Sequence, residues 1–458
     1  MPLQLLLLAL APTPATAAEV QFEGFYRARA RAFDTLSLDR GAATSEGLSA
    51  GASHRLWLRP RFMLTDKVGL FTELRGLDGV TWGDEVSGVE TFDGVPATGV
   101  EYGLNAPTGS ALLDITLSRV WGEVHTEYGR FTFGRVPLHW GLGLWLNDGL
   151  SVDVPFADHG DTTDRVMWEH LVDDQFFVRV AADVPTERFL GREDDTTAFS
   201  GAVAYRSEDL TAGLLAQVDR TGARQQNTGA LNVFTVDGAV DVTLGNLHGA
   251  AEVVAHFGAG DLDGGVNDAT ITAVGTAAHA DLELDIFTIG LRAGIATGDG
   301  QPNDAGIRAF TYDRDYSVGM FLFEQPLPTL ATAVAAANET NGGRDFSEVR
   351  SGTALSNALW IKPTVRRTLL EGLEVRVSWL GARTAKTQAI GGVRTSRSYG
   401  NEFQVGASFL GIEHLELDGQ LGLFLPGSVY AVSQTEDLSQ TGFDDAAFGF
   451  QLSSRIVF

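Results

Sequence analysis

Arginine recurs at alternate positions near the amino end of this 458-residue chain, and that spacing has a chemical consequence. Residues 25–33 read FYRARARAF, so an extended strand would carry three guanidinium groups on one face. Two following segments repeat the pattern. Rows of arginine create a positive field, and such rows are how protein pores favour anions. The charged residues predicted to share this inner face are Arg27, Arg29, Arg31, Arg55, Arg59, Arg61, Glu73, Arg75, Arg119 and Glu123.

Carboxylates alternate in the same way, which leaves a second interpretation open. These acids could pair with the arginines across neighbouring strands and hold the wall of the structure together. Pairing and anion attraction are compatible, because an arginine wall opposite an acidic wall gives a field across the space between them. The acids predicted on the inner face are Glu23, Glu73, Glu123, Glu252, Glu374, Glu402, Glu416 and Asp418.

Catalytic chemistry has weaker support in the sequence. His248 and His256 share a face with Glu252, but a spacing of four along a strand separates neighbours by about 13 Å. A second group of histidines and acids lies around one loop, without a Gly-x-Ser-x-Gly or His-Glu-x-x-His signature. We therefore expect that the protein is not an enzyme and has no cofactor. An enzymatic function is kept as a minor alternative. The members of the loop group are His139, His159, His170, Asp158 and Asp161.

Metal chemistry is limited by composition. The chain has no cysteine, which excludes disulfides, thiolate metal sites and a cysteine nucleophile. Asp299, Asn303 and Asp304 offer closely spaced oxygen ligands, a weak candidate for calcium, but they lack the ligand order of an EF-hand loop. An ordinary Gly/Asp/Asn turn is the favoured interpretation.

The elements that would position these side chains are amphipathic strands. The last segment, residues 448–458, reads FGFQLSSRIVF and alternates between an apolar and a polar face. An aromatic final residue on the apolar face is typical of the closing strand of outer-membrane barrels. We predict that Phe450, Leu452, Ile456 and Phe458 face lipid and form a carboxyl-terminal membrane-assembly signal.

The whole chain repeats this pattern. No apolar run reaches the roughly 20 residues of a membrane-spanning helix, so a membrane would be crossed by strands, which must close into a barrel. Short turns alternate with long loops, which predicts about eighteen antiparallel strands, with a range of about 16–20. The predicted fold is an all-β transmembrane up-and-down barrel. Residues 19–458 form one domain with short periplasmic turns and long extracellular loops.

Export is expected from residues 1–18, which resemble a secretory signal with an apolar core followed by Ala-Thr-Ala-Ala. No Lys or Arg precedes that core, which is atypical. The formal charge of −26 excludes nucleic acid as a partner and suits acidic external loops. The predicted location is the bacterial outer membrane.

Two loops could narrow the predicted lumen. Residues 138–146, LHWGLGLWL, are too apolar for a solvated loop, so His139, Trp140 and Trp145 form a possible constriction. Packing on the barrel rim is an equal alternative. Residues 328–343 include an Ala-rich run that favours a small helix, which could plug the channel or decorate the outside.

Several short motifs resemble the alginate-export family of outer-membrane barrels. They are residues 118–124 (SRVWGEV), 129–135 (GRFTFGR), 290–299 (GLRAGIATGD), 400–403 (GNEF) and 424–427 (FLPG). The resemblance implies a monomeric barrel of about this strand number, in which an arginine-rich lumen passes an anionic polysaccharide. The sequence departs from the family pattern after Arg135, so the architecture carries over better than the substrate.

These observations predict a porin-like channel for small, anionic, hydrophilic solutes or saccharides. Its expected partners are the lipid bilayer, the barrel-assembly machinery and the solute. The alternatives are a structural or plugged barrel without transport and, less favoured, a barrel enzyme.

Overall fold

The computed structural model describes most of the chain, in several stretches. They are residues 19–36, 38, 48–83, 115–150, 160–185, 196–221, 231–262, 266–301, 304–325, 327, 354–387, 389–390, 393–394, 397–430 and 444–458. Two predicted features, the signal at residues 1–18 and the helix at residues 328–343, lie outside these ranges.

Amphipathic alternation produces strands wherever the sequence predicted them. In chain order they are β1 (Glu19–Asp34), β2 (Leu48–Met63), β3 (Val68–Gly83), β4 (Ile115–Thr126), β5 (Gly129–Pro137), β6 (Thr162–Leu171), β7 (Phe176–Pro185), β8 (Thr196–Arg206), β9 (Leu210–Thr221), β10 (Leu231–Leu244), β11 (Leu247–Leu262), β12 (Val266–Glu283), β13 (Thr288–Ala296), β14 (Gly306–Ile307), β15 (Ala358–Leu370), β16 (Leu373–Thr384), β17 (Ala389–Ile390), β18 (Val393–Arg394), β19 (Ser398–Ile412), β20 (Leu415–Pro426) and β21 (Ala447–Val457).

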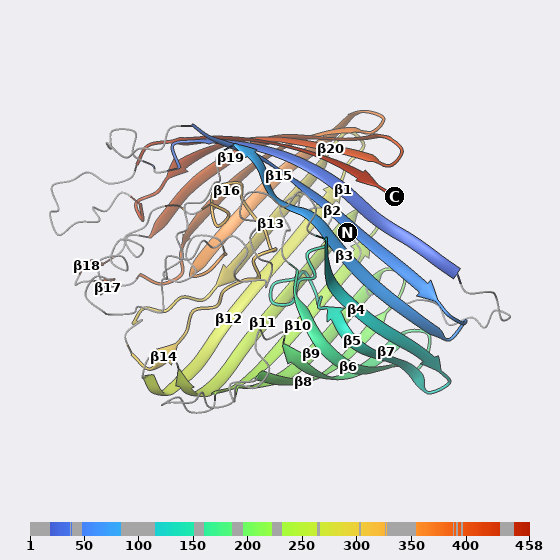
Figure 1. Ribbon diagram of the computed structural model, residues 1–458. Helices are drawn as coiled ribbons and strands as arrows, with labels where there is room; N and C mark the ends of the chain where they lie inside the picture. Colours follow the sequence, from blue (N-terminus) through green and yellow to red (C-terminus); the bar gives the residue numbers. More distant parts are fainter. Residues whose placement is uncertain are drawn as a thin grey trace.

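Eighteen of these strands close into an antiparallel barrel in the described part of the chain (Figure 1). The two-residue β14 pairs in parallel with β12, and β17 and β18 form a separate small pair. Closure occurs between the first and last strands, from Phe25 opposite Val457 to Asp34 opposite Phe448. The predicted all-β barrel and its strand number are confirmed.

Turn length separates the two ends of the barrel. Eight connections of two to four residues lie at one end, at residues 64–67, 127–128, 172–175, 207–209, 245–246, 284–287, 371–372 and 413–414. Longer connections lie at the other end, except at residues 263–265, where β11 and β12 themselves extend further. Outer-membrane barrels carry short turns on the periplasmic side, which orients this barrel.

The outer surface is apolar because outward positions alternate with inward ones. Large hydrophobic side chains are exposed around the whole ring, which suits contact with lipid; examples are Leu117, Phe133, Val166, Val180, Phe199, Val203, Val253, Phe403, Val405 and Leu421. In the described residues, no helix has the length and apolarity needed to cross a bilayer.

The carboxyl-terminal residue completes the closure. Phe458 and Gly24 exchange two backbone hydrogen bonds, of 2.8 and 3.0 Å between N and O. A Cβ at position 24 would lie 2.3 Å from the carbonyl oxygen of Trp57 and 3.0 Å from the ring of Phe458, so glycine is required there. Phe450, Leu452, Ile456 and Phe458 are all exposed on the outer face, where the alternation predicted them. Their role as an assembly signal stays a prediction.

Candidate functional site: the charged lumen

Glu73 on β3 is the centre of a buried charge cluster on the inner wall. Its carboxylate accepts hydrogen bonds from Arg59 on β2, Arg75 on its own strand and Arg119 on β4, with N–O distances of 2.9, 3.1 and 2.9 Å. The Ser118 hydroxyl donates a further bond of 2.9 Å. Three guanidinium groups thus surround one carboxylate on the inner wall.

Arg119 connects this cluster to the loop that follows β5. Its side chain is fully buried, and it donates to the hydroxyl of Thr162 and to the carbonyl oxygens of Asp148 and Asp161. Fixed donors of this kind hold the loop against the wall.

Other predicted arginines of β1 and β2 lie beside this cluster. Arg27 and Arg29 are buried, and Arg31 and Arg55 are partly buried. Arg61 forms an ion pair of 2.6 Å with Glu23.

Trp57 supports the arginine wall from the same inner face. Its ring is covered by the guanidinium groups of Arg59 and Arg75, whose Cζ atoms lie 4.9 and 4.8 Å from the ring centroid. Such stacking fixes the direction in which the two cations point.

The arginine wall extends further around the barrel than the sequence analysis predicted. Arg130 on β5 lies between Glu123 and Glu169, and Arg179 on β7 donates to Glu169 at 2.9 Å. Each is on the inward parity of its strand, and that parity was the signal available in the sequence.

A further missed arginine is Arg165 on β6. It forms two parallel bonds, of 2.6 and 2.7 Å, with Asp183 on β7. Unlike the Glu73 cluster, this region of the wall has as many carboxylates as guanidinium groups, so here the pairing interpretation describes the contacts.

Acidic side chains face inward on the opposite side of the ring. In an eighteen-strand barrel, β10 and β11 lie about nine strands from β1 and β2, and their inner faces carry Asp237, Asp241 and Glu252.

The apolar segment after β5 folds inward rather than over the rim. Trp140, only 4% exposed, packs against Ala202, Leu215 and Ala239 on β8, β9 and β10. Trp145 meets the His256 ring edge-on, with centroids 5.5 Å apart. His139 is partly exposed, with its Nδ1 3.5 Å from Asp148.

Glu252 anchors that segment. This fully buried carboxylate on β11 accepts hydrogen bonds from the backbone amides of Leu142 and Leu144. A buried carboxylate is stabilised by such donors, and the donors lose no hydrogen bond when water is excluded.

A second inward segment, residues 304–325, was missed by the sequence analysis. Its amides at Met320, Phe321 and Leu322 donate to the Glu402 carboxylate on β19, at 2.5, 3.1 and 3.0 Å. Phe310 stacks on His256. The run VGMFLF at residues 318–323 is as apolar as residues 138–146, and it was the available signal.

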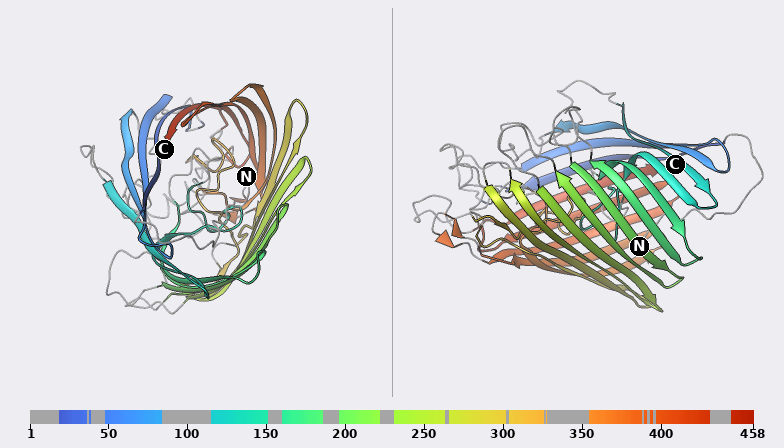
Figure 2. Two further views of the ribbon diagram at one scale, coloured as in Figure 1. Left: turned by 90° about the vertical axis from the view of Figure 1, so that its right-hand side faces the viewer. Right: turned by 90° about the horizontal axis from the view of Figure 1, so that it is seen from below.

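The two inward segments meet inside the ring, which Figure 2 (left) shows as teal and gold loops enclosed by the strands. Asp313 N donates to the carbonyl oxygen of Leu144 at 2.7 Å, and Gly160 N donates to an Asp315 carboxylate oxygen at 2.5 Å. Burial, and then the nearby carboxylates of Asp161 and Asp315, raise the pKa of Asp313 to about 9. Asp313 is therefore protonated at neutral pH and can share a hydrogen bond with Asp161.

Within the described residues, the structure assembles neither the candidate calcium site nor the group of histidines predicted around one loop. Asp299 and Asp304 both pair with Arg308, at 3.4 and 3.0 Å, so a cation already lies between them, and Asn303 is outside the described residues. His170 stacks on Trp168 on the outer face of β6 and so does not face His139. His159 and Asp158 are also outside the described residues.

Comparison with known proteins gives the fold. No protein-family model matches the chain, and no curated protein does. Among solved structures, Pseudomonas aeruginosa OccK9 (OpdG) has a TM-score of 0.54 at 12% identity, covering 96% of this chain and 99% of that one. The chain has the fold of a bacterial outer-membrane β-barrel.

Two more structures are similar at lower levels. Pseudomonas aeruginosa OccK11 (OpdR) has a TM-score of 0.51 at 9% identity and covers 96% of each chain. In-vitro folded OmpT, an outer membrane protein of Vibrio cholerae, has a TM-score of 0.39 at 10% identity, covering 97% of this chain and 99% of that one. The alginate-export family suggested by the short motifs is not shown by these comparisons.

Proposed function

We propose that this barrel is a passive outer-membrane channel that prefers small anionic hydrophilic solutes, including charged saccharides. The observation that carries the proposal is the Glu73 cluster, in which three arginines surround one carboxylate on the inner wall. Guanidinium groups fixed on the wall of a narrow, poorly hydrated lumen lower the energy of an anion there.

The inward segments set the size limit in this proposal. They contact the wall at several points, through Trp140 against β8 to β10, Phe310 on His256 of β11, and the loop carbonyls bound by Arg119 of β4. Solutes would move down their gradient without a cofactor or a chemical step.

A plugged barrel is the second candidate, and the same segments favour it. They form a continuous apolar cluster with the wall, in which Phe33, Phe321 and Phe424 are fully buried. A lumen closed by this cluster would carry no current.

Solute uptake into proteoliposomes separates these candidates. Barrels reconstituted in liposomes should admit an anionic sugar acid faster than a neutral sugar of the same size, and a cationic amino sugar most slowly. Equal exclusion of all three by correctly folded protein would instead support the plugged barrel. Equal uptake of all three would leave an open channel without the proposed preference.

A further inference from the structure

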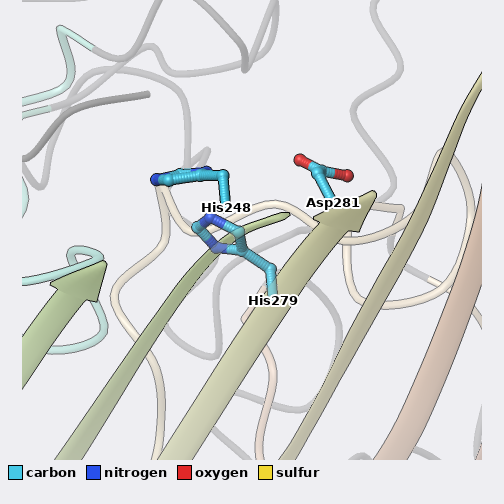
Figure 3. A group of neighbouring side chains, drawn as sticks. All are labelled: His248, His279 and Asp281. Atoms are coloured by element: carbon cyan, nitrogen blue, oxygen red, sulfur yellow. The ribbon is translucent and has the colours of Figure 1, made fainter. Parts of the chain in front are cut away.

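Two histidines and an aspartate converge on the inner wall, away from the arginine cluster. His248 lies on β11, and His279 and Asp281 lie on β12 (Figure 3). Each offers one ligand atom, and these atoms all lie within 4.8 Å of one another. The group lies two to five residues from the turns at residues 245–246 and 284–287, at the short-turn end of the lumen.

The sheet register brings the three side chains together. His248 is directly opposite Asp281, and His279 precedes Asp281 by two residues on the same face. Directly opposed residues of antiparallel strands have Cβ atoms about 4.5–5.5 Å apart. Spacing along a single strand does not reveal this group, because its candidate ligands come from two neighbouring strands, β11 and β12.

Neighbouring side chains orient the candidate ligands. The Asp241 carboxylate on β10 lies 3.2 Å from His248 Nε2, which leaves Nδ1 of that ring as the nitrogen available to a metal. Arg366 on β15 lies 2.7 Å from Asp281 Oδ1, and the second oxygen of that carboxylate remains for a ligand bond. A histidine that binds a metal usually donates its other ring N–H to a carboxylate or a carbonyl oxygen, and Asp241 is placed to accept such a bond from His248.

We propose that His248, His279 and Asp281 bind one divalent transition-metal ion, for which Zn²⁺ is the suitable probe. Two imidazoles and one carboxylate suit Zn²⁺, with a water in the fourth position. The three side chains are partly buried on rigid strands, so little order has to be created on binding. Asp241 is a positioning residue. The proposal does not depend on the channel function.

The test is Zn²⁺ titration of purified, tag-free barrel by calorimetry, together with the visible spectrum of the Co²⁺-loaded protein. We expect saturation at one Zn²⁺ per barrel and the absorption bands of a four-coordinate Co²⁺ site. H248Q and H279Q each remove a ligand, so each should weaken binding by more than the roughly 10–100-fold loss that changes of outer partners cause. Asp241→Asn should weaken it less, because the ligand atoms stay.

His414→Asn is the matched control. His414 lies in the turn between β19 and β20 and is well exposed, and asparagine tolerates its positive φ of 65°. This variant removes one histidine and should bind Zn²⁺ as the wild type does. Retained one-equivalent binding in the H248Q/H279Q double variant would overturn the proposal, as would a wild-type Co²⁺ spectrum that shows only octahedral, solvent-like cobalt.

Discussion

Glu73 holds one region of the inner wall together. It is fully buried and is the shared partner of Arg59, Arg75 and Arg119. Removing one partner of a buried ion pair leaves charge without compensation, which costs about 3–5 kcal/mol. These ion pairs therefore hold this part of the wall together.

E73Q should destabilise the barrel by about 3–5 kcal/mol, because three buried guanidinium groups then lose their shared carboxylate. The measurement is urea unfolding of the barrel in detergent micelles, followed by tryptophan fluorescence. E371Q, in an exposed turn, is the control and should leave the midpoint unchanged. An E73Q midpoint equal to that of E371Q would show that the cluster does not hold the wall.

Single residues also show where sequence reasoning succeeded. Parity along each strand was enough to place Arg27, Arg29, Arg59 and Glu73 on the inner face, because the side-chain period of a strand is two. Partners across strands were not predictable, since register depends on the turns and bulges between strands. His248 opposite Asp281 is such a case.

At the scale of elements, two carboxylates hold the inward segments through backbone amides. Glu252 holds residues 142–144 and Glu402 holds residues 320–322, over separations in sequence of about 80 to 110 residues. The apolar run at residues 138–146 predicted that one segment avoids water. Which wall it would contact was not predictable, because the partner strands lie far along the chain.

Glu402→Ala should release the segment that contains Met320, Phe321 and Leu322. Three buried amides would lose their acceptor, at about 1–3 kcal/mol each. Single-channel recordings should then show a larger and noisier conductance than the wild type.

Glu416→Ala is the comparison for that experiment. Glu416 is a lumen carboxylate whose partner is Arg455 on β21. If both variants conduct alike, or if E402A conducts no more than the wild type, Glu402 does not control the segment.

The contact between the two inward segments should depend on pH through Asp313. Its pKa of about 9 lies above the ordinary carboxyl value, so its contribution to docking is complete at acid pH and is lost as pH rises through about 9. Conductance should therefore increase between about pH 7 and about pH 10. D313N keeps a hydrogen-bond donor towards Asp161 and should flatten this increase; an unchanged pH profile in D313N would remove Asp313 from the explanation.

At the scale of the whole molecule, closure of eighteen strands explains how one chain has a lipid-facing belt and a charged interior. Alternation and turn length predicted the barrel, its strand number and its orientation, because these depend on local pattern. The filling of the lumen depends on contacts between distant segments, and only its apolar composition was visible in the sequence.

The arrangement of the strands around one lumen explains why the charge of the wall should determine ion selectivity. The basic inner face of β1 to β4 and the acidic inner face of β10 and β11 lie on opposite sides of one lumen. An ion crossing the barrel should therefore meet the field of the arginine-bearing wall, and substitution of those arginines should change that field.

The most direct test is the reversal potential of the purified protein in a planar bilayer under a KCl gradient. We expect an open pore whose reversal potential has the sign of a chloride preference. A variant with Gln at Arg27, Arg29, Arg59 and Arg61 should move that potential towards zero or reverse its sign, while the protein stays folded. A cation preference in the wild type, or a chloride preference unchanged in the variant, would contradict the central claim.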